Sequence, residues 1–88
     1  MKIHVFVVVN ESFSWGDINS STKKYFTTKE LRDEYFEFLR KDYLENMDMF
    51  ELDETNSFTP KSGSGRWSYH IEKVEDDLEI IDTKTWIK

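Results

Sequence analysis

The feature that most constrains the fold is a short apolar run near the start of the chain, VFVVV at residues 5–9. Successive side chains of a β-strand point to opposite faces, so the odd-numbered valines share one face, while Phe6 and Val8 share the other with His4. Residues 2–10 therefore predict an interior strand that is apolar on both faces at its centre. Because a single helix covers only one face of a sheet, the other face needs a separate cover.

The chain has 88 residues, the size of one small domain, and we expect a single domain over residues 1–88. A domain of this size buries only about 60% of the surface of its unfolded chain, so its core needs large side chains. Seven Phe, four Tyr and three Trp supply them. The absence of Cys excludes disulfide bonds, thiolate chemistry and cysteine-ligated zinc. Stability must come from packing or from self-association.

Charge and hydropathy narrow the classes of partner. No apolar run approaches the roughly 20 residues of a membrane span, and the first residues lack the features of a signal peptide, so we expect a cytoplasmic location. Eighteen acids against twelve bases give a net charge of -6, which repels both a phosphate backbone and an anionic membrane surface. We therefore expect neither direct nucleic-acid binding nor membrane binding.

The first half of the chain predicts two strands and a helix. Residues 11–22 are rich in Ser, Asn and Asp and predict a turn or exposed loop, and residues 23–26 predict a short strand that returns antiparallel to the first. Thr27 and Glu30 have the spacing of a capping box, which predicts a helix over about residues 28–46. Its expected apolar stripe consists of Leu31, Tyr35, Phe38, Leu39 and Tyr43.

The second half is more difficult to interpret. Residues 47–54 fit a continuing helix and a short separate turn equally well, and residues 55–65 contain the only Pro and two of the three Gly, which predicts a flexible loop. From residue 67 apolar and polar side chains alternate, which predicts a strand. Residues 75–77 predict a turn, and residues 78–88 predict a returning strand. The expected fold is α+β, with a four-stranded, mainly antiparallel sheet in the order β-β-α-β-β and one main helix on one face.

Catalytic and metal-binding motifs are lacking. The serines have no Gly-x-Ser-x-Gly context, and SGSGR at residues 62–66 lacks the Gly-Lys-Ser/Thr ending of a phosphate-binding loop. His4 and His70 would approach each other if their strands were neighbours, yet isolated histidines of this kind are more often structural than metal ligands. The acids of residues 48–57 lack the spacing of a calcium loop. We expect no enzyme activity, cofactor or metal.

The acidic residues concentrate in residues 45–54 and 72–79, which hold ten of the eighteen acids. These candidate partner-binding residues are Glu45, Asp48, Glu51, Asp53, Glu54, Glu72, Glu75, Asp76, Asp77 and Glu79. Acids interleaved with apolar residues suit a surface that docks onto a basic cleft, where charge steers the encounter and apolar contacts hold the complex. The alternative is that these acids only keep an aromatic-rich protein in solution.

Two stretches carry a resemblance to known proteins, KYFTTKELRDEYF at residues 24–36 and WSYHIEKVEDD at residues 67–77. With the order of elements, they resemble a loose class of short phage and mobile-element proteins. The chain departs from that class in its 55–65 loop and its extended C-terminal strand. The resemblance implies a small accessory protein that binds and inhibits a host protein, of the anti-CRISPR or anti-restriction type, with imitation of the DNA phosphate array as one mechanism. It brings no catalytic residues.

A second hypothesis is a homodimeric protein-interaction domain without inhibitory activity. It rests on the first strand, because a helix on the Val5 and Val7 face would leave Phe6 and Val8 without cover.

Overall fold

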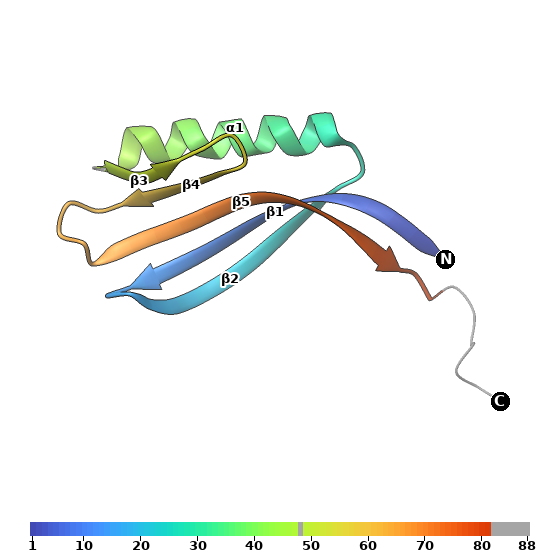
Figure 1. Ribbon diagram of the computed structural model, residues 1–88, viewed down its shortest axis with the longest axis horizontal. Coiled ribbons are helices and arrows are strands. Elements are labelled where there is room, and N and C mark those ends of the chain that lie inside the picture. Colours follow the sequence, from blue (N-terminus) through green and yellow to red (C-terminus); the bar gives the residue numbers. More distant parts are fainter. Residues whose placement is uncertain (48, 82–88) are drawn as a thin grey trace.

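The computed structural model describes residues 1–47 and 49–81, apart from the side chain of Glu51. One helix lies over one face of a strongly twisted sheet (Figure 1). The elements are β1 (Lys2–Ser14), β2 (Asp17–Phe26), α1 (Lys29–Asn46), β3 (Met49–Asp53), β4 (Ser57–Lys61) and β5 (Trp67–Glu79).

The α+β class and the single helix on an antiparallel sheet are confirmed for the described residues, but the expected number and order of strands are wrong. The sheet has five strands there, in the spatial order β2-β1-β5-β4-β3, and every neighbouring pair is antiparallel. The order along the chain is thus β-β-α-β-β-β. β1 lies in the interior of the sheet, as the apolar run predicts, between β2 and β5.

The helix covers the face of β1 opposite to the one expected. Val8 belongs to the core cluster beneath α1, whereas Val5 and Val7 point to the other face. Both are nevertheless almost fully buried, with 6% and 1% of their surface exposed. Val7 is flanked in register by Tyr25 of β2 and Val74 of β5.

The core beneath α1 is built from Val8, Phe36, Phe58 and Ile71. Phe36 is fully buried, while Leu31 and Phe38, expected in the apolar stripe, are 50% and 63% exposed. Tyr35, Leu39 and Tyr43 from the expected stripe do pack against the core. The helix is therefore rotated relative to the expectation, because its inward row includes the buried Arg32 and the ring of Phe36.

The helix also begins one residue later than expected. Thr28, with extended backbone dihedral angles, is the N-cap, and its hydroxyl accepts a hydrogen bond from the backbone N–H of Leu31 at 3.3 Å. The predicted capping box between Thr27 and Glu30 is thus wrong by one position, because either threonine can supply the same oxygen.

The expected loop at residues 11–22 is a hairpin. β1 and β2 are joined at Trp15 and Gly16, both in the left-handed region with φ of 53° and 86°. Two such residues match the twist of a tight antiparallel hairpin, and Gly tolerates this conformation without strain. The register of the two strands shifts between Ser12 and Phe13, as at a β-bulge, and the pairing continues on both sides of this shift.

Two further expectations in the second half are wrong. Residues 57–61, in the middle of the predicted loop, form β4, with Phe58 and Pro60 buried. The pairing of β4 with β5 omits Thr59 and Pro60, which is how the proline is accommodated. Residues 49–53, predicted as helix or turn, form β3.

The predicted turn at residues 75–77 is absent, because β5 runs without interruption from Trp67 to Glu79. Its last part pairs along its whole length with β1, from Phe6↔Glu75 to Lys2↔Glu79. Asp76 and Asp77 are compatible with a turn, but the segment has no Gly or Pro to impose one, and pairing with β1 determines its structure. The predicted returning strand at residues 78–88 falls partly in β5, and residues 82–88 lie outside the described residues.

Candidate functional site

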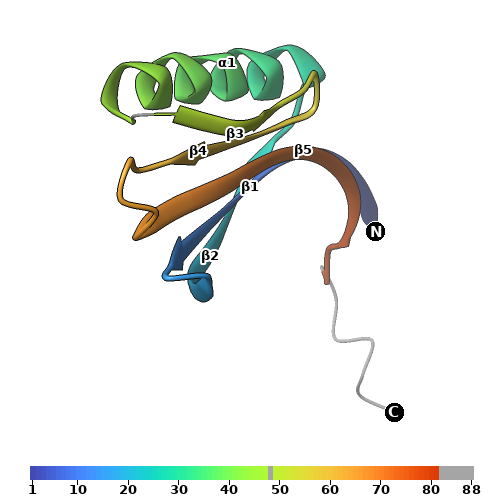
Figure 2. The same ribbon diagram turned by 60° about the vertical axis from the view of Figure 1, so that its left-hand side comes forward.

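The ends of β1 and β5 extend beyond the other strands as a two-stranded arm, residues 2–5 paired with residues 76–79. The pairing of β2 with β1 reaches only Phe6, and that of β4 with β5 reaches only Glu72. The arm curves away from α1 in both views (Figures 1 and 2).

The arm has one charged face and one largely apolar face, as the register requires. Paired residues point to the same side of a sheet, so His4 shares a face with Asp77, and Ile3 shares the opposite face with Leu78. On this side β5 carries a row of three carboxylates, Glu75 at the base of the arm and Asp77 and Glu79 on it, which we call the acidic row. Alternate residues of a strand are about 7 Å apart, so the row is regular and extended.

The acidic row is exposed but has cationic neighbours. The His4 ring lies between two of its carboxylates, with Nδ1 2.8 Å from Asp77 Oδ1 and Nε2 3.4 Å from Glu75 Oε2. The amino group of Met1 lies 3.5 Å from Glu79 Oε1. The three acidic side chains remain 51%, 65% and 56% exposed. Lys2 also pairs with Glu79 and points to the same side. Solvent therefore has access to a row of acids whose charge is partly balanced by the Met1 amino group and Lys2, and further balanced when His4 is protonated.

The protonation of His4 is coupled to this row. The hydrogen bond with Asp77 raises the pKa of His4 above its ordinary value of 6.5, and the negative charges of Asp77 and Glu75 act in the same direction. Protonation of the ring would cancel one of the three negative charges of the row.

The other candidate acids occupy different places. Glu72 and Asp76 point to the helix-free face of β5. The Asp53 carboxylate lies 3.3 Å from the guanidinium of Arg40. Glu45 is exposed on α1. The Glu54 side chain is also exposed, while its backbone carbonyl accepts a hydrogen bond from Arg40 at 2.6 Å. Asp48 and the side chain of Glu51 lie outside the described residues. Among the described candidates, only the acidic row places three carboxylates at alternate positions on one face of one element.

The two histidines do not meet. β1 and β5 are neighbours, but His4 pairs with Asp77 whereas His70 pairs with Glu11 on the opposite face. His70 Nδ1 lies 3.0 Å from the hydroxyl of Thr59, which is a structural contact within the sheet. Across residues 1–47 and 49–81, no group of three or more His, Asp or Glu side chains is placed to hold a metal ion.

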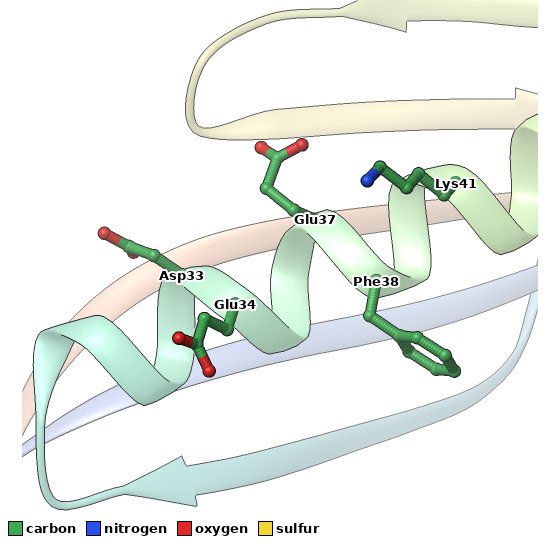
Figure 3. A pocket seen from close by; sticks show the side chains of 5 residues that line it. All are labelled: Asp33, Glu34, Glu37, Phe38 and Lys41. Atoms are coloured by element: carbon green, nitrogen blue, oxygen red, sulfur yellow. The ribbon is translucent and has the colours of Figure 1, made fainter.

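The outer surface of α1 carries an acidic and apolar recess that the sequence interpretation missed. The recess has a volume of about 500 Å³ and is lined by Asp33, Glu34, Glu37, Phe38 and Lys41 (Figure 3). Phe38 projects to one side of the helix, stacked against Tyr35 with 6.4 Å between ring centroids, and Glu37 projects to the other. The apolar spacing of the helix had placed Phe38 in the buried stripe, so the sequence pattern held no signal for this recess, and Phe38 is 63% exposed.

Comparison with known proteins gave no match to a protein family, to a curated protein or to a solved structure. Within the described part of the chain, α1 is the only helix, and it lacks the apolar character required to cross a membrane.

Proposed function

We propose that this protein is a small, non-enzymatic accessory protein that binds a partner protein with a basic surface and inhibits or modulates it. The acidic row on the two-stranded arm is the observation that carries the proposal. Its three carboxylates are regularly spaced and exposed; Asp77 and Glu79 project from an arm that the other strands do not flank, and Glu75 lies at the base of that arm.

Apolar groups near the row supply the second component of such a surface. Met1 and Ile80 are 65% and 38% exposed, at the same end of the molecule as the row. A binding surface of this kind uses charge to steer the encounter and apolar contacts to slow dissociation. The row alone is too small to bind tightly, so these residues belong to the proposed surface.

The partner we propose is a nucleic-acid-binding or phage-defence protein in the cytoplasm. A basic groove that receives phosphates also attracts a regular row of carboxylates, so the row would compete with nucleic acid for that groove. The resemblance to short phage and mobile-element proteins supports the same class of partner.

Two double charge reversals on the same strand test the proposal. Asp77→Lys with Glu79→Lys reverses the charge of the acidic row, and Glu72→Lys with Asp76→Lys makes the same change of net charge on the opposite face of β5. Affinity capture from a bacterial lysate at low and high salt compares both variants with the wild-type chain. We expect the row variant to lose salt-sensitive partners that the opposite-face variant keeps.

A captured partner must also release bound DNA when the wild-type protein is added. Capture of the same proteins by all three chains would show that the row has no specific role. Circular dichroism of both variants establishes that the fold is retained.

A homodimer is the second candidate, and the helix-free sheet face favours it. Tyr25 on this face is 50% exposed, beside the buried Val7. Lys23 and Glu72 lie on either side of Val9 in one cross-strand row of the same face. A two-fold axis along β1 would place Lys23 of one copy over Glu72 of the other, so the face is complementary to itself in charge.

A further inference from the structure

A second recess contains a concentration of positive charge in this acidic protein. It has a volume of about 470 Å³ and lies between the first turn of α1, the β3–β4 turn and the middle of β5. Its charged lining residues are Lys29, Arg32, Asp33, Lys73 and Glu75. Three cations against two carboxylates leave one positive charge in excess, although the whole chain carries a net charge of -6.

Arg32 forms the base of this recess and is only 5% exposed. Its Nη1 donates to the backbone carbonyl of Val74 at 2.9 Å, and its Nε and Nη2 lie 3.1 and 3.0 Å from Asp33 Oδ1. Its guanidinium carbon also lies 5.3 Å from the ring centroid of Phe6. These contacts hold the guanidinium rigidly, while each Nη carries a second N–H that these contacts do not use.

The Lys73 side chain projects into the recess from β5 and forms an ion pair with the same carboxylate, that of Asp33. Its side chain is 12% exposed, its Nζ lies 3.6 Å from Asp33 Oδ1, and it sits over the ring of Phe36 at 4.9 Å. One oxygen of Asp33 therefore serves two largely buried cations. Desolvating two cations against one carboxylate is costly, and a further anion would balance the charge.

Glu75 does not supply that balance, because one positive charge remains in excess when its carboxylate is counted; this carboxylate lies 3.4 Å from His4 Nε2. The neutral wall is formed by Thr55 and Asn56 of the β3–β4 turn. The backbone carbonyl of Asn56 accepts a hydrogen bond from the Lys73 N–H at 2.8 Å, which fixes this turn against β5.

We propose that this recess binds the phosphate group of a small molecule. Lys29, Arg32 and Lys73 reach it from the start of the helix, the helix interior and β5, and donors from three directions suit the tetrahedral oxygens of a phosphate better than a planar carboxylate. The volume exceeds that of the phosphate alone, so a phosphate ester with a polar substituent against Thr55 and Asn56 fits the site. The recess shares Glu75 with the acidic row, but the inference does not require the partner proposed above.

Titration of the isotopically labelled full chain tests the inference. Inorganic phosphate and glycerol phosphate are added at constant ionic strength, with sodium chloride and acetate as comparison anions. We expect saturable shifts of the backbone amide signals of Lys29, Asn56 and Val74 with both phosphates, and weaker shifts with acetate.

Substitutions locate the site. Lys73→Met keeps the apolar stem of the side chain but removes its charged donor, and we expect the dissociation constant for glycerol phosphate to rise about tenfold. Lys29→Ala should also weaken phosphate binding, and because Lys29 is exposed, we expect this variant to fold. Lys41→Met removes the same charge from α1 outside the recess, and should leave binding unchanged.

Two outcomes would overturn the inference. One is the absence of saturable phosphate binding by the folded wild-type chain, and the other is equal weakening by Lys41→Met and Lys29→Ala, which would indicate nonspecific attraction. Acetate bound as tightly as phosphate would overturn the assignment of the ligand class. The Asp77→Lys and Glu79→Lys variant should bind phosphate as the wild-type chain does, so that failure of one proposal is distinguishable from failure of the other.

Discussion

Among single residues, His4 has the clearest dependence on pH. It contacts two carboxylates of the acidic row, and the hydrogen bond with Asp77 raises its pKa above 6.5. A group with a raised pKa in the folded state stabilises the fold fully below its unfolded pKa, and this contribution is lost as the pH rises through the folded pKa. The His4 interactions therefore favour folding in mild acid and fade toward alkaline pH.

Substitution of Asp77 by Asn should lower the pKa of His4 toward its ordinary value, because it removes both the charge-assisted hydrogen bond and the nearest negative charge. An NMR titration of the His4 ring measures this. Asp76→Asn, one residue away on the opposite face, is the matched control and should have a smaller effect. Equal effects of the two substitutions would contradict the observed pairing.

Residue-level burial was only partly predictable from the sequence. The alternation of β1 correctly separates Val7 from Val8, but alternation does not reveal which face receives the helix. Arg32 was expected outside the apolar stripe and is buried, because a guanidinium can reach a carbonyl and an aromatic ring inside the protein. Phe38 was expected inside and is exposed. Residue type alone does not fix such positions.

Among the elements, β5 differs most from its expectation, and it carries the acidic row on which the proposed function rests. The acids of residues 75–77 would be spread around a turn if they connected two strands. In the continuous strand, residues 75 and 77 share one face with residue 79, and residue 76 points to the other. The strand is therefore what converts a local cluster of acids into the acidic row.

Substitutions of Asp76 distinguish a strand from a turn at this position. Thr favours a strand and Gly disfavours it, so we expect Asp76→Gly to be less stable than Asp76→Thr by about 1 kcal/mol. Both substitutions remove the same charge, so electrostatics cancels in the comparison. Urea denaturation measures the free energy of unfolding, and a more stable Gly variant would indicate a turn.

The elements that sequence patterns identified best are those with strong local signals. The helix was expected over residues 28–46 and spans Lys29–Asn46, because a threonine cap and a long amphipathic segment mark it locally. Most of β2, with its run of Ser, Thr and Asn, has loop-like composition and is a strand because β1 pairs with it. β3 and β4 likewise depend on tertiary pairing, which overrides weak local preference.

At the scale of the whole molecule, the strands are longer than the helix that covers them. The 18 residues of α1 span about 27 Å, whereas the 13 residues of β1 and of β5 each span about 43 Å. The two-stranded arm is the part that α1 does not reach. The Cα radius of gyration is 16.2 Å, against about 12 Å for a compact domain of this length.

The second candidate function predicts association through the helix-free face. Tyr25→Glu places an additional charge at an exposed position on this face and should convert a dimer to a monomer. Leu44→Glu introduces the same charge at a position on α1 that is 64% exposed, and should leave the dimer intact. Light scattering coupled to gel filtration gives the mass. A monomeric wild-type chain at micromolar concentration would rule out this candidate.

The position of β1 between β2 and β5 also has a consequence for how the chain folds during synthesis. The β1–β2 hairpin emerges from the ribosome early, but the other edge of β1 pairs with residues up to 77 positions away, as in Lys2↔Glu79. Such a high contact order slows folding. Until β5 is synthesised, the VFVVV segment remains an unpaired apolar edge, which makes the nascent chain prone to aggregation.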